Sequence, residues 1–170
     1  MWVFGYGSLI WDGWEKALAC DARVVADLRG FRRAFNKLSN RNWGSWENPC
    51  PTLNLLKDES AVCRGIAFHF PDDQEQIVLA KLRQREGKNF DLVLLSVHLT
   101  DTRQVYAYTS LYTGRNLITD LPLDSLVAMI RDAQGRDGHC RKYVTGIANA
   151  LAAHDIRDPC VEVLMREIHR

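Results

Sequence analysis

The chain has 170 residues, of which 46% are hydrophobic and 25% are charged, and its formal net charge is +1. This length suits one domain with a core of its own, and the composition is that of an ordinary globular protein. A charge so close to zero excludes a strong field for nucleic acid, a membrane surface or an acidic partner. No apolar run approaches the roughly 18–20 residues that span a bilayer, and no signal peptide is recognisable.

The five cysteines are widely spaced and include no Cys-x-x-Cys motif; they are Cys20, Cys50, Cys63, Cys140 and Cys160. An odd number at such spacings argues against a disulfide framework and against a zinc site. The five histidines contain no His-x-x-x-His pair. We therefore expect a protein of the reducing cytoplasm with no metal and no cofactor, whose chemistry comes from carboxylates, hydroxyls and backbone groups.

Strands are predicted for most of the first two-thirds of the chain. Trp2–Tyr6 is the first, and a short extended piece at Leu9–Trp11 follows a glycine turn. Apolar and β-branched runs predict the remaining strands, at Arg23–Asp27, Gly30–Lys37, Thr52–Leu56, Cys63–Phe70, Leu92–Leu99 and Gln104–Ser110. Ser39–Pro51 is rich in Asn, Gly, Ser and Pro and is predicted to be a loop.

Helices are predicted at Gln74–Arg85 and throughout the last third, where apolar residues recur at helical spacing in Asp124–Ala133 and Arg141–His154. Asp158 and Pro159 begin a final helix. No linker or repeat interrupts residues 1–170. We therefore expect one α+β domain, with a small mixed sheet or barrel and flanking helices.

The first strand ends in Gly5-Tyr6-Gly7-Ser8-Leu9, a turn in which the backbone can approach a ligand closely and direct successive N–H groups outward. A plain tight turn between two strands explains the glycines equally well. A dinucleotide fingerprint does not fit, because Ile10 stands where its third glycine belongs and Asp12-Gly13 interrupts any following helix.

Glu86 lies between the predicted helix and Gly87, where the helix dipole disfavours a negative charge. An acid in such a field can acquire a pKa suited to proton transfer. The simpler interpretation is a surface ion pair with Arg83 or Lys88.

Taken together, the sequence resembles the ChaC-like γ-glutamylcyclotransferase family over nearly its whole length. The run Val3–Trp11 matches the first strand of that family in full, and Arg85-Glu86-Gly87 matches the segment with its essential glutamate. The sequence departs from the motifs of this family in three places. The family's Gly-Gly-Tyr is here Lys88-Asn89-Phe90, and its Pro-Gly-Arg-Thr is Pro49-Cys50-Pro51-Thr52. An Asn and a Glu of its last motif are here Cys140 and Lys142.

The resemblance implies an enzyme that cyclises a small γ-glutamyl substrate to 5-oxoproline without a cofactor. Glu86 would be the catalytic acid and base, and the backbone of Tyr6, Gly7, Ser8 and Leu9 would bind the substrate. Tyr143 would contact the glutamyl group through its hydroxyl, and Arg41 would meet a second carboxylate. Packed or solvated side chains remain the alternatives for Tyr143 and Arg41.

Two other interpretations stay open. The basic and aromatic run Arg29–Lys37, with Arg41 and Trp43, could form a groove for single-stranded nucleic acid. Alternatively, the protein could be an inactive module that binds a γ-glutamyl or carboxylate ligand in the glycine turn. The physiological substrate and the oligomeric state do not follow from the sequence.

Overall fold

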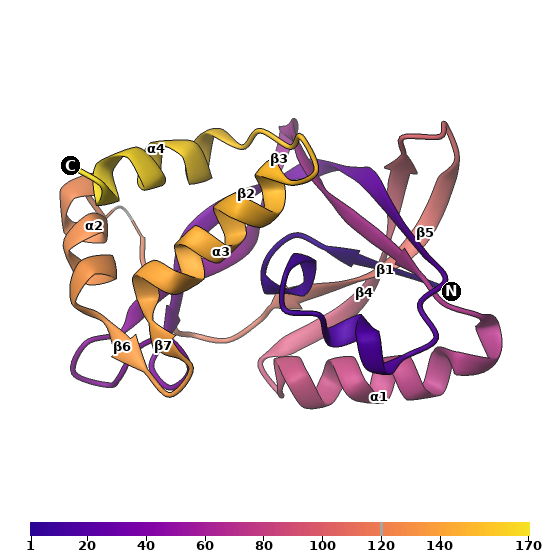
Figure 1. Ribbon diagram of the computed structural model, residues 1–170, viewed down its shortest axis with the longest axis horizontal. Helices are drawn as coiled ribbons and strands as arrows, with labels where there is room; N and C mark the ends of the chain where they lie inside the picture. Colours follow the sequence, from indigo (N-terminus) through magenta and orange to yellow (C-terminus); the bar gives the residue numbers. More distant parts are fainter. Residues whose placement is uncertain (120) are drawn as a thin grey trace. The chain divides into compact units, whose positions relative to one another are not determined.

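In the computed structural model, which describes residues 1–119 and 121–170, five strands close into a barrel in the order β1-β3-β2-β4-β5 (Figure 1). β1 is Trp2–Gly5, and it pairs antiparallel with β3 and parallel with β5. β4 (Phe90–Leu99) and β5 (Gln104–Tyr112) form an antiparallel hairpin. The expected α+β fold with a closed sheet is therefore confirmed.

The two longest strands are β2 (Ala22–Ser39) and β3 (Cys50–His69), with 18 and 20 residues. Each replaces two shorter predicted strands. β2 continues through Gly30, whose φ of 79° is readily adopted only by glycine. A glycine inside a strand commonly marks a local kink rather than a break, so the strand continues where the sequence pattern suggested two.

Contacts divide the chain into two compact units, each described here by itself. The first comprises Met1–Arg32 and Leu55–Gly114, and the second comprises Arg33–Asn54 and Arg115–Arg170. The expectation of one domain over residues 1–170 stays a prediction. The first unit holds β1, β4, β5 and the parts of β2 and β3 that fall in its ranges. It also holds the 3₁₀ turns η1 (Ser8–Ile10), η2 (Trp14–Ala17) and η3 (Asp72–Gln74), and helix α1 (Glu75–Glu86).

The second unit holds the remaining parts of β2 and β3, a short hairpin, and three helices that pack on one another (Figure 1). The hairpin strands are β6 (Gln134–Gly135) and β7 (Gly138–His139), and the helices are α2 (Leu123–Asp132), α3 (Cys140–Ala152) and α4 (Pro159–Ile168). The predicted helices are confirmed with small shifts of their ends, whereas the hairpin was not predicted.

Each unit buries a core of its own. In the first, the α1 residues Val78 and Leu82 are fully buried with Phe4 and Phe68 of the barrel. In the second, Ile130, Val144, Ile147 and Leu164 come from the three helices. Among the described residues, none of the helices combines the length and the apolar character needed to cross a bilayer.

Candidate functional site

The glycine turn after β1 is a 3₁₀ turn, not the predicted extended piece. The Ile10 N–H donates to the Gly7 carbonyl at 3.0 Å, and the Trp11 N–H donates to the Ser8 carbonyl at 3.2 Å. The N–H groups of Ser8 and Leu9 precede the first of these bonds, so they are not used inside the turn. A 3₁₀ turn after a barrel strand also rules out the helix that a dinucleotide site would need.

The side chain of Tyr6 fixes this turn to the barrel. Its ring is buried, and its hydroxyl donates to the backbone carbonyl of Ser110 on β5 at 3.0 Å. Gly7 and Leu9 are also buried, while Ser8 is half-buried. The turn is therefore anchored on both sides of Ser8, the residue whose side chain reaches outward.

Glu86 is the last residue of α1, and Gly87 ends the helix. The Gly87 N–H donates to the Arg83 carbonyl at 2.9 Å, and its φ of 76° is one that residues with a Cβ rarely adopt. The Glu86 side chain is only 16% exposed. A largely buried carboxylate at the negative end of a helix needs a nearby cation or hydrogen-bond donors.

Arg85 supplies that cation and reaches the glycine turn as well. Its Nε lies 3.2 Å from Glu86 Oε1, and its Nη2 donates to Ser8 Oγ at 2.7 Å. The same guanidinium forms an ion pair with Asp12, just beyond the turn. Arg85 is thus a cation that lies directly beside Glu86. One guanidinium joins the predicted catalytic acid to the predicted substrate loop.

In the second unit, the predicted substrate residue Tyr143 lies on α3. Its ring is 5% exposed and packs against Trp43, with ring centroids 5.5 Å apart. Its hydroxyl oxygen accepts the backbone N–H of Leu53 at 3.1 Å. The Tyr143 hydroxyl therefore has a hydrogen-bond partner within the protein. Its predicted contact with the glutamyl group stays a prediction.

Arg41 lies in the loop between β2 and β3, also in the second unit. Its side chain is exposed, and its carbonyl accepts the Arg136 N–H at 2.9 Å. The backbone of the loop is therefore held by the β6–β7 hairpin, because the Asp137 N–H also donates to the Asn42 carbonyl at 2.7 Å. The predicted contact of the Arg41 guanidinium with a substrate carboxylate is not tested by these observations.

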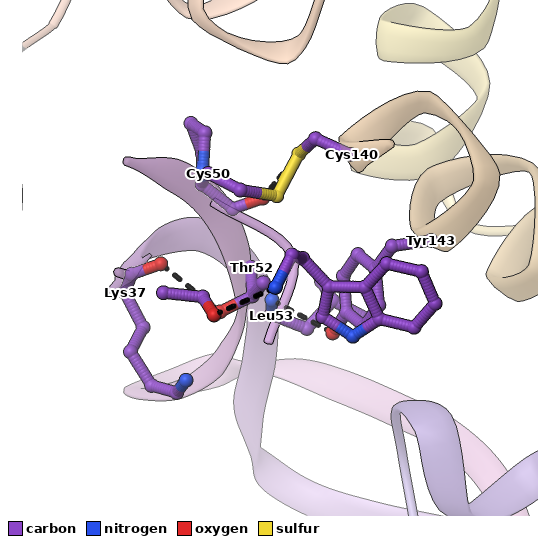
Figure 2. The surroundings of a disulfide bond; sticks show 9 residues. Lys37, Cys50, Thr52, Leu53, Cys140 and Tyr143 are labelled. Carbon is purple, nitrogen blue, oxygen red and sulfur yellow. Dashed lines mark hydrogen bonds between the residues drawn. A yellow bond between two sulfur atoms is a disulfide. The ribbon is translucent and has the colours of Figure 1, made fainter. Parts of the chain in front are cut away.

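A disulfide joins Cys50 to Cys140 in the second unit, close to Tyr143 (Figure 2). The argument from cysteine count and spacing against a disulfide framework therefore missed this pair. The two residues are 90 positions apart in the sequence, yet their Cα atoms are 5.7 Å apart. Disulfide formation depends on such tertiary proximity, which spacing and cysteine count do not reveal. Cys20, Cys63 and Cys160 keep their thiols.

The basic run that suggested a nucleic-acid groove is largely used in internal contacts. The Arg33 side chain is fully buried, and its Nη1 lies 2.9 Å from Asp158 Oδ2. Phe35 is buried, and Arg32 pairs with Asp58 at 3.3 Å. Nucleic-acid grooves need exposed cations and aromatic rings, so this segment does not offer one. Within the described residues, no three His, Cys, Asp or Glu side chains cluster as metal ligands would.

Comparisons with known proteins show the family of the chain. The family model described as ChaC-like protein matches residues 1–170, so the chain belongs to the ChaC-like family. A relative named gamma-glutamylcyclotransferase 2-3 from Arabidopsis thaliana is 28% identical over 99% of this chain and 88% of its own length. The zebrafish (Danio rerio) protein named glutathione-specific gamma-glutamylcyclotransferase 1 is 25% identical over 94% of this chain and 84% of its own.

Among solved structures, the fold is similar to that of the yeast γ-glutamyl cyclotransferase specific to glutathione. The TM-score is 0.88, with 20% identity, and the match covers 99% of this chain and 95% of the yeast chain. At this identity the likeness shows the fold alone.

Two features of these surroundings were not predicted as parts of the site. Arg85 was named only as part of the motif around Glu86, and its contact with Ser8, 77 residues away, needs the fold. The Cys50–Cys140 pair did leave a signal, because both cysteines stand where the sequence departs from the motifs of the ChaC-like family.

Proposed function

We propose that this protein is a γ-glutamylcyclotransferase, which converts a γ-glutamyl peptide to 5-oxoproline and a free amine. The names of its relatives point to glutathione as the substrate, in which case the amine is Cys-Gly. Family membership over the whole chain supports the reaction class. The observation that carries the assignment of residues is the guanidinium of Arg85, which contacts both Glu86 and the glycine turn.

The reaction is an internal acyl transfer. The α-amine of the substrate attacks its own γ-carbonyl, forming a C–N bond that closes a five-membered lactam, and the original γ-amide bond then breaks. Because both reacting groups belong to one molecule, much of the entropic cost of bringing them together is already met. The protein must provide proton transfer and stabilise the negative charge on the carbonyl oxygen.

Glu86 performs the proton transfer in this proposal. Its carboxylate takes a proton from the substrate ammonium, which cannot attack while it is protonated, and returns the proton to the departing nitrogen. Removal from solvent favours this role, since the side chain is 16% exposed. Arg85 keeps the carboxylate oriented and takes no part in the proton transfer, because its guanidinium stays protonated.

The backbone of the glycine turn stabilises the developing charge. The N–H groups of Ser8 and Leu9, which the 3₁₀ turn does not use, are donors suited to the tetrahedral oxyanion or to the α-carboxylate. A donor oriented toward an oxyanion contributes about 2–4 kcal/mol to transition-state stabilisation. Two side chains complete the proposal. The Tyr143 hydroxyl contacts the glutamyl group, and Arg41 binds a second carboxylate of the substrate.

The experiment that tests the proposal is the formation of 5-oxoproline, measured by mass spectrometry, from glutathione and a panel of γ-glutamyl dipeptides and amines. Glu86→Gln should lower the rate by about 10²–10⁴-fold, because the amide cannot carry the proton. Glu75→Gln is the matched control: the same change, on the same helix, at a carboxylate that accepts the Tyr108 hydroxyl at 2.8 Å. It should keep near-parental activity.

The outcomes separate the two candidate functions. If Glu86→Gln is as active as the parent, the assignment of Glu86 is wrong. If the folded parent turns over no γ-glutamyl compound yet binds one, the chain is an inactive module that holds a carboxylate ligand in the glycine turn. The altered segment Lys88-Asn89-Phe90 after Glu86 is the feature that keeps this alternative in view.

The compartment in which we propose that the protein works is the cytoplasm. The thiols of Cys20, Cys63 and Cys160 suit a reducing environment. A small γ-glutamyl molecule is the partner that the reaction requires. Subcellular fractionation with an antibody to the chain should place it with cytoplasmic markers; recovery in a secreted fraction would contradict this assignment.

A further inference from the structure

The disulfide between Cys50 and Cys140 joins the first residue of β3 to the first residue of α3. Both residues have no exposed surface. The bond therefore fixes, at one covalent point, how the start of the strand and the start of the helix lie relative to each other within the second unit.

Three residues further along both elements, a second contact joins the same strand and helix. The Leu53 N–H on β3 donates to the Tyr143 hydroxyl on α3 at 3.1 Å, and Figure 2 shows this bond beside the disulfide. On the same stretch of β3, Thr52 Oγ1 donates to the Lys37 carbonyl of β2 at 3.1 Å. The position of the Tyr143 hydroxyl thus depends on the spacing that the disulfide fixes.

The other connections of this helix start are noncovalent. The Tyr143 ring packs against Trp43, Arg141 Nη2 donates to the Ile168 carbonyl at 2.9 Å, and backbone hydrogen bonds join the helix start to short segments. The Cys140 N–H donates to the Ala133 carbonyl at 2.9 Å, and the hairpin between them is held by the Arg41 and Asn42 carbonyls. Each neutral hydrogen bond contributes only about 0.5–1.5 kcal/mol net. The disulfide is the one covalent cross-link among the described residues near Tyr143, and so we expect its opening to loosen this region.

We propose that Cys50 and Cys140 are positioning residues for Tyr143: their disulfide holds the tyrosine hydroxyl in place for substrate, and its reduction weakens substrate binding. This inference rests on the proposed function, and it adds that substrate binding depends on the redox state of Cys50 and Cys140. Because Tyr143 binds the glutamyl group and does not carry the transferred proton, loosening it raises KM and leaves kcat nearly unchanged.

Reduction proceeds by thiol–disulfide exchange. A thiolate of a small dithiol or of glutathione attacks one sulfur and forms a mixed disulfide, and a second thiol displaces the other sulfur. Two electrons and two protons pass to Cys50 and Cys140, and two reductant thiols become one disulfide. Glutathione disulfide reverses the reaction with the same balance. The proposed substrate is itself such a thiol, so it would act on the enzyme in two ways.

The test compares the oxidised and the reduced protein with a substrate that has no thiol, such as S-methylglutathione or γ-glutamylalanine. Alkylation and intact mass establish the state, since complete reduction exposes two additional thiols. We expect KM to rise about three- to tenfold on reduction, the factor that one neutral hydrogen bond accounts for, with kcat within about twofold. Treatment with glutathione disulfide should restore the original KM.

A second readout does not depend on catalysis. Amide hydrogen exchange of Leu53, whose N–H is the donor to Tyr143, should become about tenfold faster or more on reduction. The amides of Val3 and Phe4 in β1 serve as the internal reference, because they belong to the barrel of the first unit. Their exchange should not change.

Three variants assign the effect to the pair and to the tyrosine. Cys50→Ser/Cys140→Ser should have the raised KM from the outset and should not respond to reductant. Cys160→Ser, in α4 of the same unit, keeps the disulfide and should respond as the parent does. Tyr143→Phe should have a raised KM that reduction does not raise further. If the double variant does not fold, the reduced and reoxidised parent still provide the comparison.

An unchanged KM and an unchanged Leu53 exchange rate in fully reduced protein would overturn the inference. So would a response to reductant that the double serine variant shares. A protein that forms no 5-oxoproline in either state refutes the proposed function instead, and the exchange of Leu53 then still decides whether the bond holds the tyrosine.

Discussion

At the residue scale, Arg85 connects side chains from two segments that are far apart in the sequence. It contacts Glu86 on its own helix, and Ser8 and Asp12 on the turn after β1. Arginine presents several donors in a planar, rigid arrangement, so it can satisfy several acceptors at once, whereas lysine acts as a point charge. We therefore expect this side chain to contribute to the alignment of the acid with the turn.

Replacing Arg85 tests that dependence. Arg85→Gln should lower kcat/KM by about 10–100-fold, because small displacements of catalytic groups are costly, and Arg85→Lys should restore only part of the loss. The measurement is 5-oxoproline formation, with and without added guanidinium ion, which should partly rescue the glutamine variant. Arg83→Gln, an exposed arginine on the same helix, is the control. Equal activity of both glutamine variants would show that Arg85 does not position the acid.

How far the site was predictable also differs from residue to residue. Glu86 and the turn Tyr6–Leu9 were identified from motifs that are continuous in the sequence. The contact between Arg85 and Ser8 was not, since nothing local relates residues that are 77 positions apart. The same holds for Cys50 and Cys140: their side chains meet only because β3 and α3 start beside each other.

At the element scale, the end of α1 determines where Glu86 lies. Gly87 has a φ of 76°, and no atom lies within 4 Å of where a Cβ would stand. Substitution there meets backbone strain rather than a clash. Such strain costs on the order of 1–3 kcal/mol, and the chain can relieve it by changing how the last helical turn ends.

Gly87→Ala should therefore lower both stability and activity. Gly30→Ala in β2 is a closely matched control, because Gly30 has a φ of 79° and an equally open surrounding. We expect the melting temperature to fall by a similar amount in both variants. Only Gly87→Ala should also lose kcat/KM beyond what its lower stability explains. Parallel losses of activity in the two variants would argue against a role of the helix end in placing Glu86.

The elements themselves were predicted unevenly, for identifiable reasons. Asp158 caps α4 by accepting the N–H groups of Cys160 and Val161 at 3.1 and 3.3 Å, with Pro159 in the first turn, and this end was predicted correctly. Caps are local, so sequence reveals them. The 3₁₀ turn at Ser8–Ile10 and the length of β2 depend on tertiary contacts, and both were missed.

At the scale of the whole molecule, several carboxylates couple stability to pH. Two hydrogen bonds from Arg64, at 2.6 and 2.8 Å, lower the pKa of Asp27 below its ordinary value of 3.8, despite partial burial. A pKa that is lower in the folded than in the unfolded state stabilises the fold above the unfolded value. That stabilisation is lost as the pH falls through the folded value.

Asp27→Asn should accordingly flatten the acid side of the stability profile. Between about pH 5 and pH 2, the melting temperature of the parent should fall more steeply than that of the variant. Arg64→Gln should flatten the profile as well, because it removes the cause of the low pKa. Parallel profiles for all three proteins would show that this pair contributes nothing to the acid sensitivity.

The Cys50–Cys140 bond also determines what becomes of a chain that has been cut. The turn Asp101–Arg103 between β4 and β5 is exposed and lies between the two cysteines in the sequence. A protease that cleaves there produces two fragments, each of which carries one half of the disulfide. These fragments migrate as one species on a non-reducing gel and as two after reduction, so a cut at this turn leaves a single covalent molecule until its disulfide is opened.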